Sequence, residues 1–202
     1  MQVINMKRTD FDKYYKSPLH RILFRWVDIK KSGLLDEYIS GENLRICDLG
    51  CGTGKISSRL AKKNTVYGVD WNESLLKIAA QNGLKTSKSL VEKTKFKDNF
   101  FDAVVMIDSI EHLHSREKIG RELKRITKRN GLIIIFTPAY DSVLWNIGEK
   151  FLNSVTGKKS DHTTPFTKES MEFFLKKNKF EIEKIKKINM GLGLFAAAKK
   201  TE

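Results

Sequence analysis

The sequence predicts an α/β protein in which a mainly parallel sheet carries helices on both faces. Short apolar stretches alternate with segments of helical periodicity along most of the chain, which is the pattern of parallel strands joined by crossover helices. A glycine-rich turn follows the first apolar stretch, and acidic residues stand at the ends of the first two. Since open α/β sheets bind ligands at the carboxyl ends of their strands, these features indicate a ligand site there.

Length and composition predict a single domain over residues 1–202. The 202 residues are 40% hydrophobic, which suffices for one full core and is too little for two. No run of about eighteen apolar residues occurs, and the first residues lack the apolar core of a signal peptide, so we expect a cytoplasmic protein with no transmembrane segment. Cys47 and Cys51 are the only cysteines. Two cysteines cannot supply a four-ligand zinc site, and we expect free thiols.

A helical region is predicted ahead of the first strand, over residues 8–39. Lys30 and Lys31 close this run before Gly33. The spacing predicts one or two helices. The apolar and aromatic positions of this region are Phe11, Tyr14, Tyr15, Ile22, Leu23, Trp26 and Ile29.

The most informative stretch is ICDLGCGTG, residues 46–54. It predicts a short strand, a turn with glycine at positions 50, 52 and 54, and a helix from Lys55 to Lys63. Glycine can take positive φ and lets a ligand approach the main chain closely. The third glycine of a GxGxxG dinucleotide motif would stand where Lys55 is, and the P-loop spacing GxxxxGK[ST] is absent.

A second apolar strand, from Thr65 to Val69, ends in Asp70, where a carboxylate can accept hydrogen bonds from two ribose hydroxyls. With the glycine spacing and Asp48, this arrangement resembles the class I S-adenosylmethionine-dependent methyltransferases. The resemblance implies a doubly wound, Rossmann-like sheet of seven strands, one of them antiparallel, and S-adenosylmethionine as cofactor. The cofactor-binding residues that it implies are Asp48, Gly50, Cys51, Gly52, Thr53 and Gly54 for the methionine part, Asp70 for the ribose, and Trp71 and Asn72 beside the adenine.

The same resemblance divides the chain into four segments: a helical cap (1–43), a cofactor-binding core (44–140), an insertion that shapes the substrate pocket (141–166), and a C-terminal helix with two strands (167–202). Tyr14, Tyr15 and His20 of the cap are candidates for a lid, and the aromatic pair fits a helix core as well. In many members an acidic residue holds the adenine amino group. The matching position in this sequence falls near Leu90, so the resemblance leaves backbone groups or Glu92 to hold the adenine.

The strand predicted over Phe101–Ile107 brings Asp108, Ser109, Glu111 and His112 to its carboxyl end. The segment DSIEHL is similar to that of small-molecule methyltransferases, including the ubiquinone-biosynthesis O-methyltransferases. It is also similar to the ExxEH segment of small-RNA 3′-terminal methyltransferases, which binds a divalent metal. The first similarity implies that Asp108 and Ser109 contact the cofactor and that His112 is a general base with Glu111 beside it. The second implies a metal at Asp108, Glu111 and His112; a structural role for Glu111 is the remaining alternative.

The rest of the chain continues the alternation. Helices are predicted from Glu73 to Gln81, from Ser115 to Asn130–Gly131, and after Thr167. The insertion contains His162, a second histidine that we place near the substrate, although bonding within its own loop fits equally. The remaining strands are predicted at Leu84–Val91, Leu132–Phe136, Phe180–Ile188 and Leu192–Ala198.

The net charge is +14, from 38 basic and 24 acidic residues. Such a charge suits an anionic partner such as nucleic acid, but the basic residues are mostly lysines spread over every segment, as in solvated faces. The function predicted is methyl transfer from S-adenosylmethionine to a small-molecule acceptor. The alternatives are an RNA methyltransferase and a catalytically silent cofactor-binding module. The sequence leaves the acceptor and the oligomeric state open.

Overall fold

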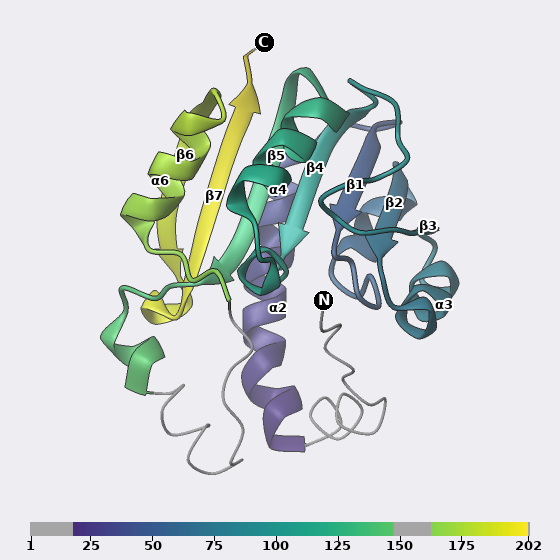
Figure 1. Ribbon diagram of the computed structural model, residues 1–202. Coiled ribbons are helices and arrows are strands. Elements are labelled where there is room, and N and C mark those ends of the chain that lie inside the picture. Colours follow the sequence, from purple (N-terminus) through teal and green to yellow (C-terminus); the bar gives the residue numbers. More distant parts are fainter. Residues whose placement is uncertain (1–17, 148–162, 202) are drawn as a thin grey trace.

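The computed structural model describes residues 18–147 and 163–201, and of residues 18–24 only the backbone. These residues form one seven-stranded sheet with the order β3-β2-β1-β4-β5-β7-β6 (Figure 1). The strands are β1 (Arg45–Leu49), β2 (Thr65–Asp70), β3 (Lys85–Lys88), β4 (Phe101–Ile107), β5 (Thr127–Pro138), β6 (Phe180–Ile188) and β7 (Gly193–Lys200).

Six of the seven strands run parallel, and β7 is antiparallel to both of its neighbours. Strand β1 pairs in parallel with β2 and β4, β2 with β3, and β4 with β5, whereas β7 pairs antiparallel with β5 and β6. The predicted sheet, including its one antiparallel strand, is confirmed. The ends of β1, β2, β4 and β5 therefore meet at one edge, which we call the carboxyl edge.

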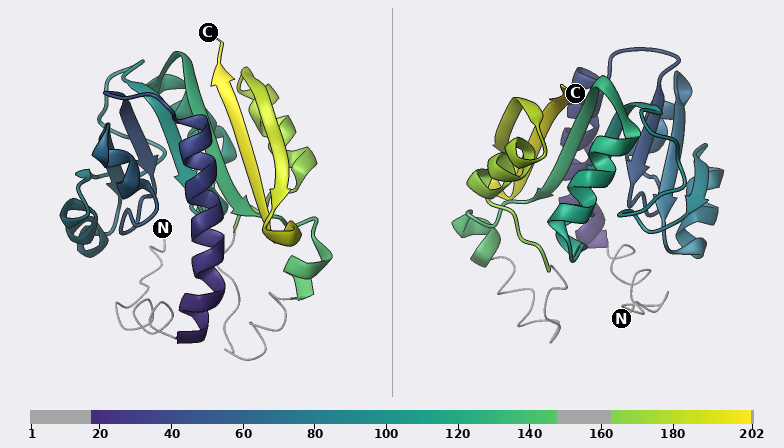
Figure 2. Two further views of the ribbon diagram at one scale, coloured as in Figure 1. Left: turned by 180° about the vertical axis from the view of Figure 1, so that it is seen from behind. Right: turned by 45° about the horizontal axis from the view of Figure 1, so that its top comes forward.

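Helices cover both faces, as predicted. Figure 2 shows α2 (Pro18–Tyr38) crossing one face, while α4 (Arg116–Ile126) and α6 (Lys168–Lys177) lie on the other and α3 (Glu73–Gln81) lies beside β3. Leu34 and Leu35 of α2 pack in a core cluster with Phe136 of β5 and Phe195 of β7. The buried residues of α4 and α6 form a second cluster on the opposite face: Ile119, Leu123, Ile126, Met171, Phe174 and Leu175.

Helix α2 corrects the predicted cap. It continues through Gly33 to Tyr38, because Leu34, Leu35 and Ile39 have a core to pack against that local periodicity does not reveal. Trp26 and Ile29 are 52% and 59% exposed, and Figure 1 shows the first half of α2 extending past the carboxyl edge, beyond the sheet. The lid candidates Tyr14 and Tyr15 and the side chain of His20 lie outside the described residues.

The segment after the glycine turn also differs from the prediction. The helix expected from Lys55 to Lys63 is a short 3₁₀ helix, η1 (Ser57–Lys62). Gly54 has φ +66°, and the chain makes turns at positions 55 and 56 before η1 begins. The turn therefore presents no long α-helix N-terminus to a ligand.

Two other boundaries move because β5 is long. Ser115 caps α4 as predicted, with its side chain accepting from the Lys118 N–H, but the helix ends at Ile126 and not at Asn130–Gly131. Strand β5 begins at Thr127, and Asn130 takes φ +60° where β5 and β4 shift register. The strand predicted over Leu84–Val91 is reduced to β3. Helix α6 follows Thr167 as predicted, and Thr167 caps it in a reciprocal capping box with Ser170.

Candidate functional site

The glycine turn lies at the carboxyl edge and is held against β2. The N–H groups of Gly50 and Cys51 both donate to the Val69 carbonyl oxygen, at 2.8 and 2.9 Å. Gly50, Gly52 and Gly54 all have positive φ, at +78°, +52° and +66°. A Cβ on Gly50 would lie 2.6 Å from Ser109 Cβ, whereas a Cβ on Gly52 would meet no atom within 4 Å. Packing therefore explains the first glycine, and open space for a ligand lies beside the second.

Asp70 joins the glycine turn to the start of α3. Its Oδ2 accepts from the Gly52 N–H at 2.9 Å, and its Oδ1 accepts from the Asn72 N–H at 2.8 Å. The Asn72 side chain caps α3 by accepting from the N–H groups of Ser74 and Leu75. Burial raises the pKa of Asp70, and these backbone N–H donors counteract the rise. Trp71, which lies between Asp70 and Asn72 in the chain, has a side chain that is 45% exposed.

Asp48 is a buried carboxylate with an unused oxygen. Its Oδ2 accepts from the Ser57 hydroxyl at 2.5 Å, while its Oδ1 has no hydrogen-bond partner among residues 18–147 and 163–201. Burial raises the pKa of Asp48 to about 7, and the nearby charge of Asp70 adds to the rise. An unpaired buried carboxylate oxygen is costly, so a positively charged ligand beside the turn would be stabilised by it.

Ser109 and Asp108 follow β4 at the same edge. The Ser109 hydroxyl donates to the Leu49 carbonyl at 2.9 Å, which fastens the end of β4 to the end of β1 next to Gly50. Asp108 takes φ +49°, an uncommon conformation outside glycine. Its carboxylate forms an ion pair with Lys31 of α2.

Lys31, which we expected only at the end of a helix, also belongs to the site. Lys31 is only 6% exposed and reaches from α2 to Asp108 at the carboxyl edge. It precedes Leu34 and Leu35 by three and four residues, so it shares their buried face of α2. The sequence therefore contained a signal that Lys31 is buried. It contained no signal that Lys31 pairs with Asp108, which is 77 residues away.

Glu111 lies in the short helix η2 (Ile110–His112) and is 1% exposed. Its Oε2 accepts from the Thr137 hydroxyl at 3.1 Å, and its Oε1 has no hydrogen-bond partner among the described residues. Burial raises the pKa of Glu111 to about 7, and the charge of Asp108 contributes. The Glu111 carbonyl accepts from the N–H groups of Thr163 and Thr164, both at 2.9 Å, so η2 also anchors the chain after the insertion.

His112 follows directly, is half-buried, and acts electrostatically on Glu111. Both side chains therefore lie at the carboxyl edge as predicted, and their catalytic roles stay predictions. His162 lies outside the described residues. Among the described residues, no three His, Cys, Asp or Glu side chains are grouped so that they could hold a metal ion; the metal alternative at Asp108, Glu111 and His112 stays a hypothesis.

The turn, the two strand-end carboxylates and the sheet together define a fold of the class I methyltransferase type. Solved structures share it. A SAM-dependent methyltransferase from Thermotoga maritima superposes with a TM-score of 0.73 at 19% identity, covering 95% of each chain. Another from Aquifex aeolicus gives a TM-score of 0.68 at 19% identity, covering 96% of this chain and 99% of that one. At such identities the likeness concerns the fold.

Residues 47–135 match the family model described as a methyltransferase domain. The uncharacterized protein MJ1123 of Methanocaldococcus jannaschii is 33% identical over 103 residues, which are 51% of this chain and 49% of that protein. The ubiquinone/menaquinone biosynthesis C-methyltransferase UbiE of Burkholderia cenocepacia is 28% identical over 109 residues, 48% of this chain and 45% of UbiE. The chain spans about half the length of these relatives.

Motif, fold and family match agree: residues 47–135 match a methyltransferase domain, and the fold is that of solved S-adenosylmethionine-dependent methyltransferases. The cofactor of such a domain fits the residues present. Gly52 leaves room against the main chain, Asp48 has a free buried oxygen, and Asp70 stands at the end of β2. No helix among the described residues is long and apolar enough to cross a membrane; the cytoplasmic location stays a prediction.

Proposed function

We propose that this protein transfers the methyl group of S-adenosylmethionine to a small-molecule acceptor at the carboxyl edge. The observation that supports this proposal most is the open space beside Gly52. The Gly52 N–H donates to the Asp70 carboxylate, and the buried carboxylate of Asp48 lies four residues earlier in the chain. S-adenosylmethionine supplies a methyl group activated by a positively charged sulfur. Asp70 would hold the ribose, the turn would hold the methionine part, and Trp71 and Asn72 would flank the adenine.

The charges of this edge suit a positively charged cofactor. Asp48, Asp70, Asp108 and Glu111 all lie in or beside the turn and the end of β4, and Asp108 is paired with Lys31. Carboxylates in a partly buried site attract a cation more strongly than they would in water. Asp48 and Glu111 would then be ionised with the cofactor bound, since a nearby positive charge lowers the pKa of an acid.

Apolar side chains near the same edge support a small acceptor with apolar surface. Val143, Leu144 and Ile147 are 72%, 52% and 60% exposed, and Met190 is 80% exposed. The two segments are joined, because the Ala139 N–H donates to the Leu192 carbonyl at 3.1 Å and Lys187 pairs with Asp141 at 2.9 Å. Figure 1 shows the turn after β6 and the helical residues 143–147 at the carboxyl edge. UbiE, one of the relatives, is named for quinone biosynthesis.

Proton removal from the acceptor would fall to His112, with Glu111 beside it. An imidazole titrates near neutral pH and can accept a proton as the acceptor attacks. Most of the acceleration would come from aligning acceptor and donor. His162 is a second candidate for contact with the acceptor.

The test is calorimetric titration of the purified protein with S-adenosylmethionine and S-adenosylhomocysteine, followed by turnover assays on a panel of phenolic, quinol and amine acceptors. Asp70→Ala should weaken cofactor binding by about 1.5 to 3 kcal/mol, the value of hydrogen bonds to a charged group. Lys62→Ala, an exposed change in η1, is the matched control and should bind normally. Cofactor binding without turnover on any acceptor would favour the silent module, and no binding at all would refute the proposal.

A further inference from the structure

A basic hollow lies between the C-terminal ends of α4 and α6, at the opposite end of these helices from the cofactor turn. Its volume is about 410 Å³. The residues that line it are Arg121, Lys124, Arg125, Lys177, Asn178 and Lys179. Five of the six are cationic, and none is acidic or aromatic. The charge of the lining therefore suits an anion.

Gly120 and Asn178 bring the two helices together there. A Cβ on Gly120 would overlap the Asn178 side chain, so a larger residue at position 120 would displace that side chain. The Asn178 side chain in turn donates to the Phe174 carbonyl at 2.8 Å and closes α6. Figures 1 and 2 show α4 and α6 side by side on one face of the sheet. The hollow is a fixed consequence of this packing.

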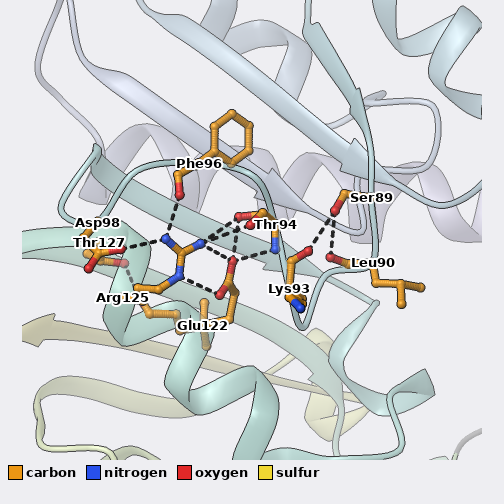
Figure 3. A network of polar contacts seen from close by, with 10 residues as sticks. Ser89, Leu90, Lys93, Thr94, Phe96, Asp98, Glu122, Arg125 and Thr127 are labelled. Atoms are coloured by element: carbon orange, nitrogen blue, oxygen red, sulfur yellow. Dashed lines mark hydrogen bonds and ion pairs between the residues drawn. The ribbon is translucent and has the colours of Figure 1, made fainter.

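The two arginines of the hollow are engaged by acids. Arg125 donates to Glu122 at 2.7 and 2.9 Å and to Asp98 at 2.8 Å, in the network of Figure 3. Arg121 pairs with Glu117, one turn earlier on α4. Arg125 is therefore held by the protein itself and supports the wall of the hollow.

Two of the three lysines that line the hollow are different. Neither the Lys124 nor the Lys177 side chain forms a hydrogen bond or ion pair with any residue in the described ranges. Burial lowers the pKa of Lys200; the charge of Lys124 adds to this effect and that of Asp98 opposes it. An anion in the hollow would be attracted by the unpaired ammonium groups of Lys124 and Lys177. Lysine ammonium groups offer point charges to phosphate rather than a fixed fork.

An exposed aromatic ring continues the hollow along α6. Phe173 is 66% exposed and precedes Lys177 by four residues, so both occupy one side of the helix. A basic groove next to an exposed aromatic ring is the arrangement by which proteins bind single-stranded nucleic acid, with phosphates on the cations and a base stacked on the ring. A lipid surface or a free phosphate would use the cations and leave the ring without a role.

We propose that the hollow and Phe173 form a binding surface for single-stranded nucleic acid. Lys124 and Lys177 would contact backbone phosphates, and Phe173 would stack one base. Asn178, the one uncharged residue of the lining, already donates to the Phe174 carbonyl, so recognition would depend on phosphates and stacking and would be largely independent of sequence. The surface is separate from the cofactor turn, so the inference holds whichever acceptor is methylated.

The experiment is fluorescence anisotropy of a labelled oligouridylate of about twelve nucleotides, titrated with the full chain at several salt concentrations. Lys124→Gln with Lys177→Gln should reduce the slope of log affinity against log salt by about 1.4, the loss of two phosphate contacts. Lys30→Gln with Lys62→Gln is the matched control; both lysines are exposed, and both lie on elements of the other face. This control variant should keep most of the affinity for the oligonucleotide. Phe173→Ala should cost about fivefold or more.

Three results would overturn the proposal: no binding of the oligonucleotide at low salt, equal weakening by the hollow pair and the control pair, or full affinity in Phe173→Ala. Vesicles containing anionic lipid form a parallel arm. Vesicle binding that the lysine pair abolishes, with oligonucleotide binding unaffected, would replace nucleic acid by a lipid surface. Calorimetry with S-adenosylmethionine shows that each variant is folded, because none of these residues belongs to the turn.

Discussion

Gly50 and Gly52 are two residues apart, but substitution by alanine should mainly reduce stability at position 50 and mainly reduce cofactor affinity at position 52. Gly50→Ala places a Cβ 2.6 Å from Ser109 Cβ at φ +78°. Left-handed backbone costs an alanine about 1 to 2 kcal/mol, and overpacking adds about 1 to 3. Because Ser109 is fixed to the Leu49 carbonyl, it cannot move aside cheaply. We expect a loss of about 3 kcal/mol in the free energy of unfolding.

Gly52→Ala incurs only the backbone cost of about 1 to 2 kcal/mol, because its Cβ would meet no atom within 4 Å. The new methyl group would instead occupy the space that we assign to the cofactor. We therefore expect cofactor affinity to fall at least tenfold, which is about 1.4 kcal/mol.

Urea unfolding and calorimetric titration with S-adenosylhomocysteine measure the two effects separately. Ser109→Gly in the Gly50→Ala background removes the clashing Cβ and should restore part of the stability. An alanine at position 52 that binds cofactor as tightly as glycine would refute the assignment of this space. A Gly50→Ala protein as stable as the parent would refute the packing argument.

Three further predictions follow from the same geometry. His112→Ala should depress turnover and leave cofactor affinity nearly intact in calorimetry; equal loss of both would contradict a general base. Burial raises the pKa of Asp48 to about 7, so the contribution of Asp48 to the free energy of unfolding is present below about pH 4 and is lost as pH rises through 7. Cofactor affinity should rise over the same pH range, because the ionised carboxylate attracts the positively charged cofactor. Asp48→Asn should flatten both pH profiles. Arg125→Met leaves Glu122, 5% exposed, without its guanidinium, and should cost about 3 kcal/mol in urea unfolding; unchanged stability would show that Thr94 suffices.

The sequence predicted the glycine turn and the sheet well, because both depend on local rules. Positive φ at positions 50, 52 and 54 needs no information beyond the glycines themselves. Asp70 reaches the turn because parallel strands that are neighbours in sequence end at the same edge. The order of strands follows from the alternation of elements and from the resemblance.

Long-range packing produced the differences. A glycine such as Gly33 often ends a helix, but α2 continues past it because Leu34 and Leu35 pack against Phe136 and Phe195 of the sheet. Lys31 became part of the site through Asp108, and no spacing in the sequence connects the two. The predicted end of α4 at Asn130 was wrong for a similar reason: Thr127 already pairs with Phe101 of β4, so the chain is a strand before the glycine is reached.

Helix α4 connects the two proposed surfaces and keeps them apart. Its start is fixed by the Ser115 cap and follows η2, whose Glu111 carbonyl accepts from Thr163 and Thr164. Its end is fixed by Arg125 in the network of Figure 3. Its 11 residues span about 16 Å at the usual rise of an α-helix. A small acceptor cannot bridge that length, so oligonucleotide binding and methyl transfer should respond to different substitutions. A hollow variant that loses cofactor affinity would contradict this separation.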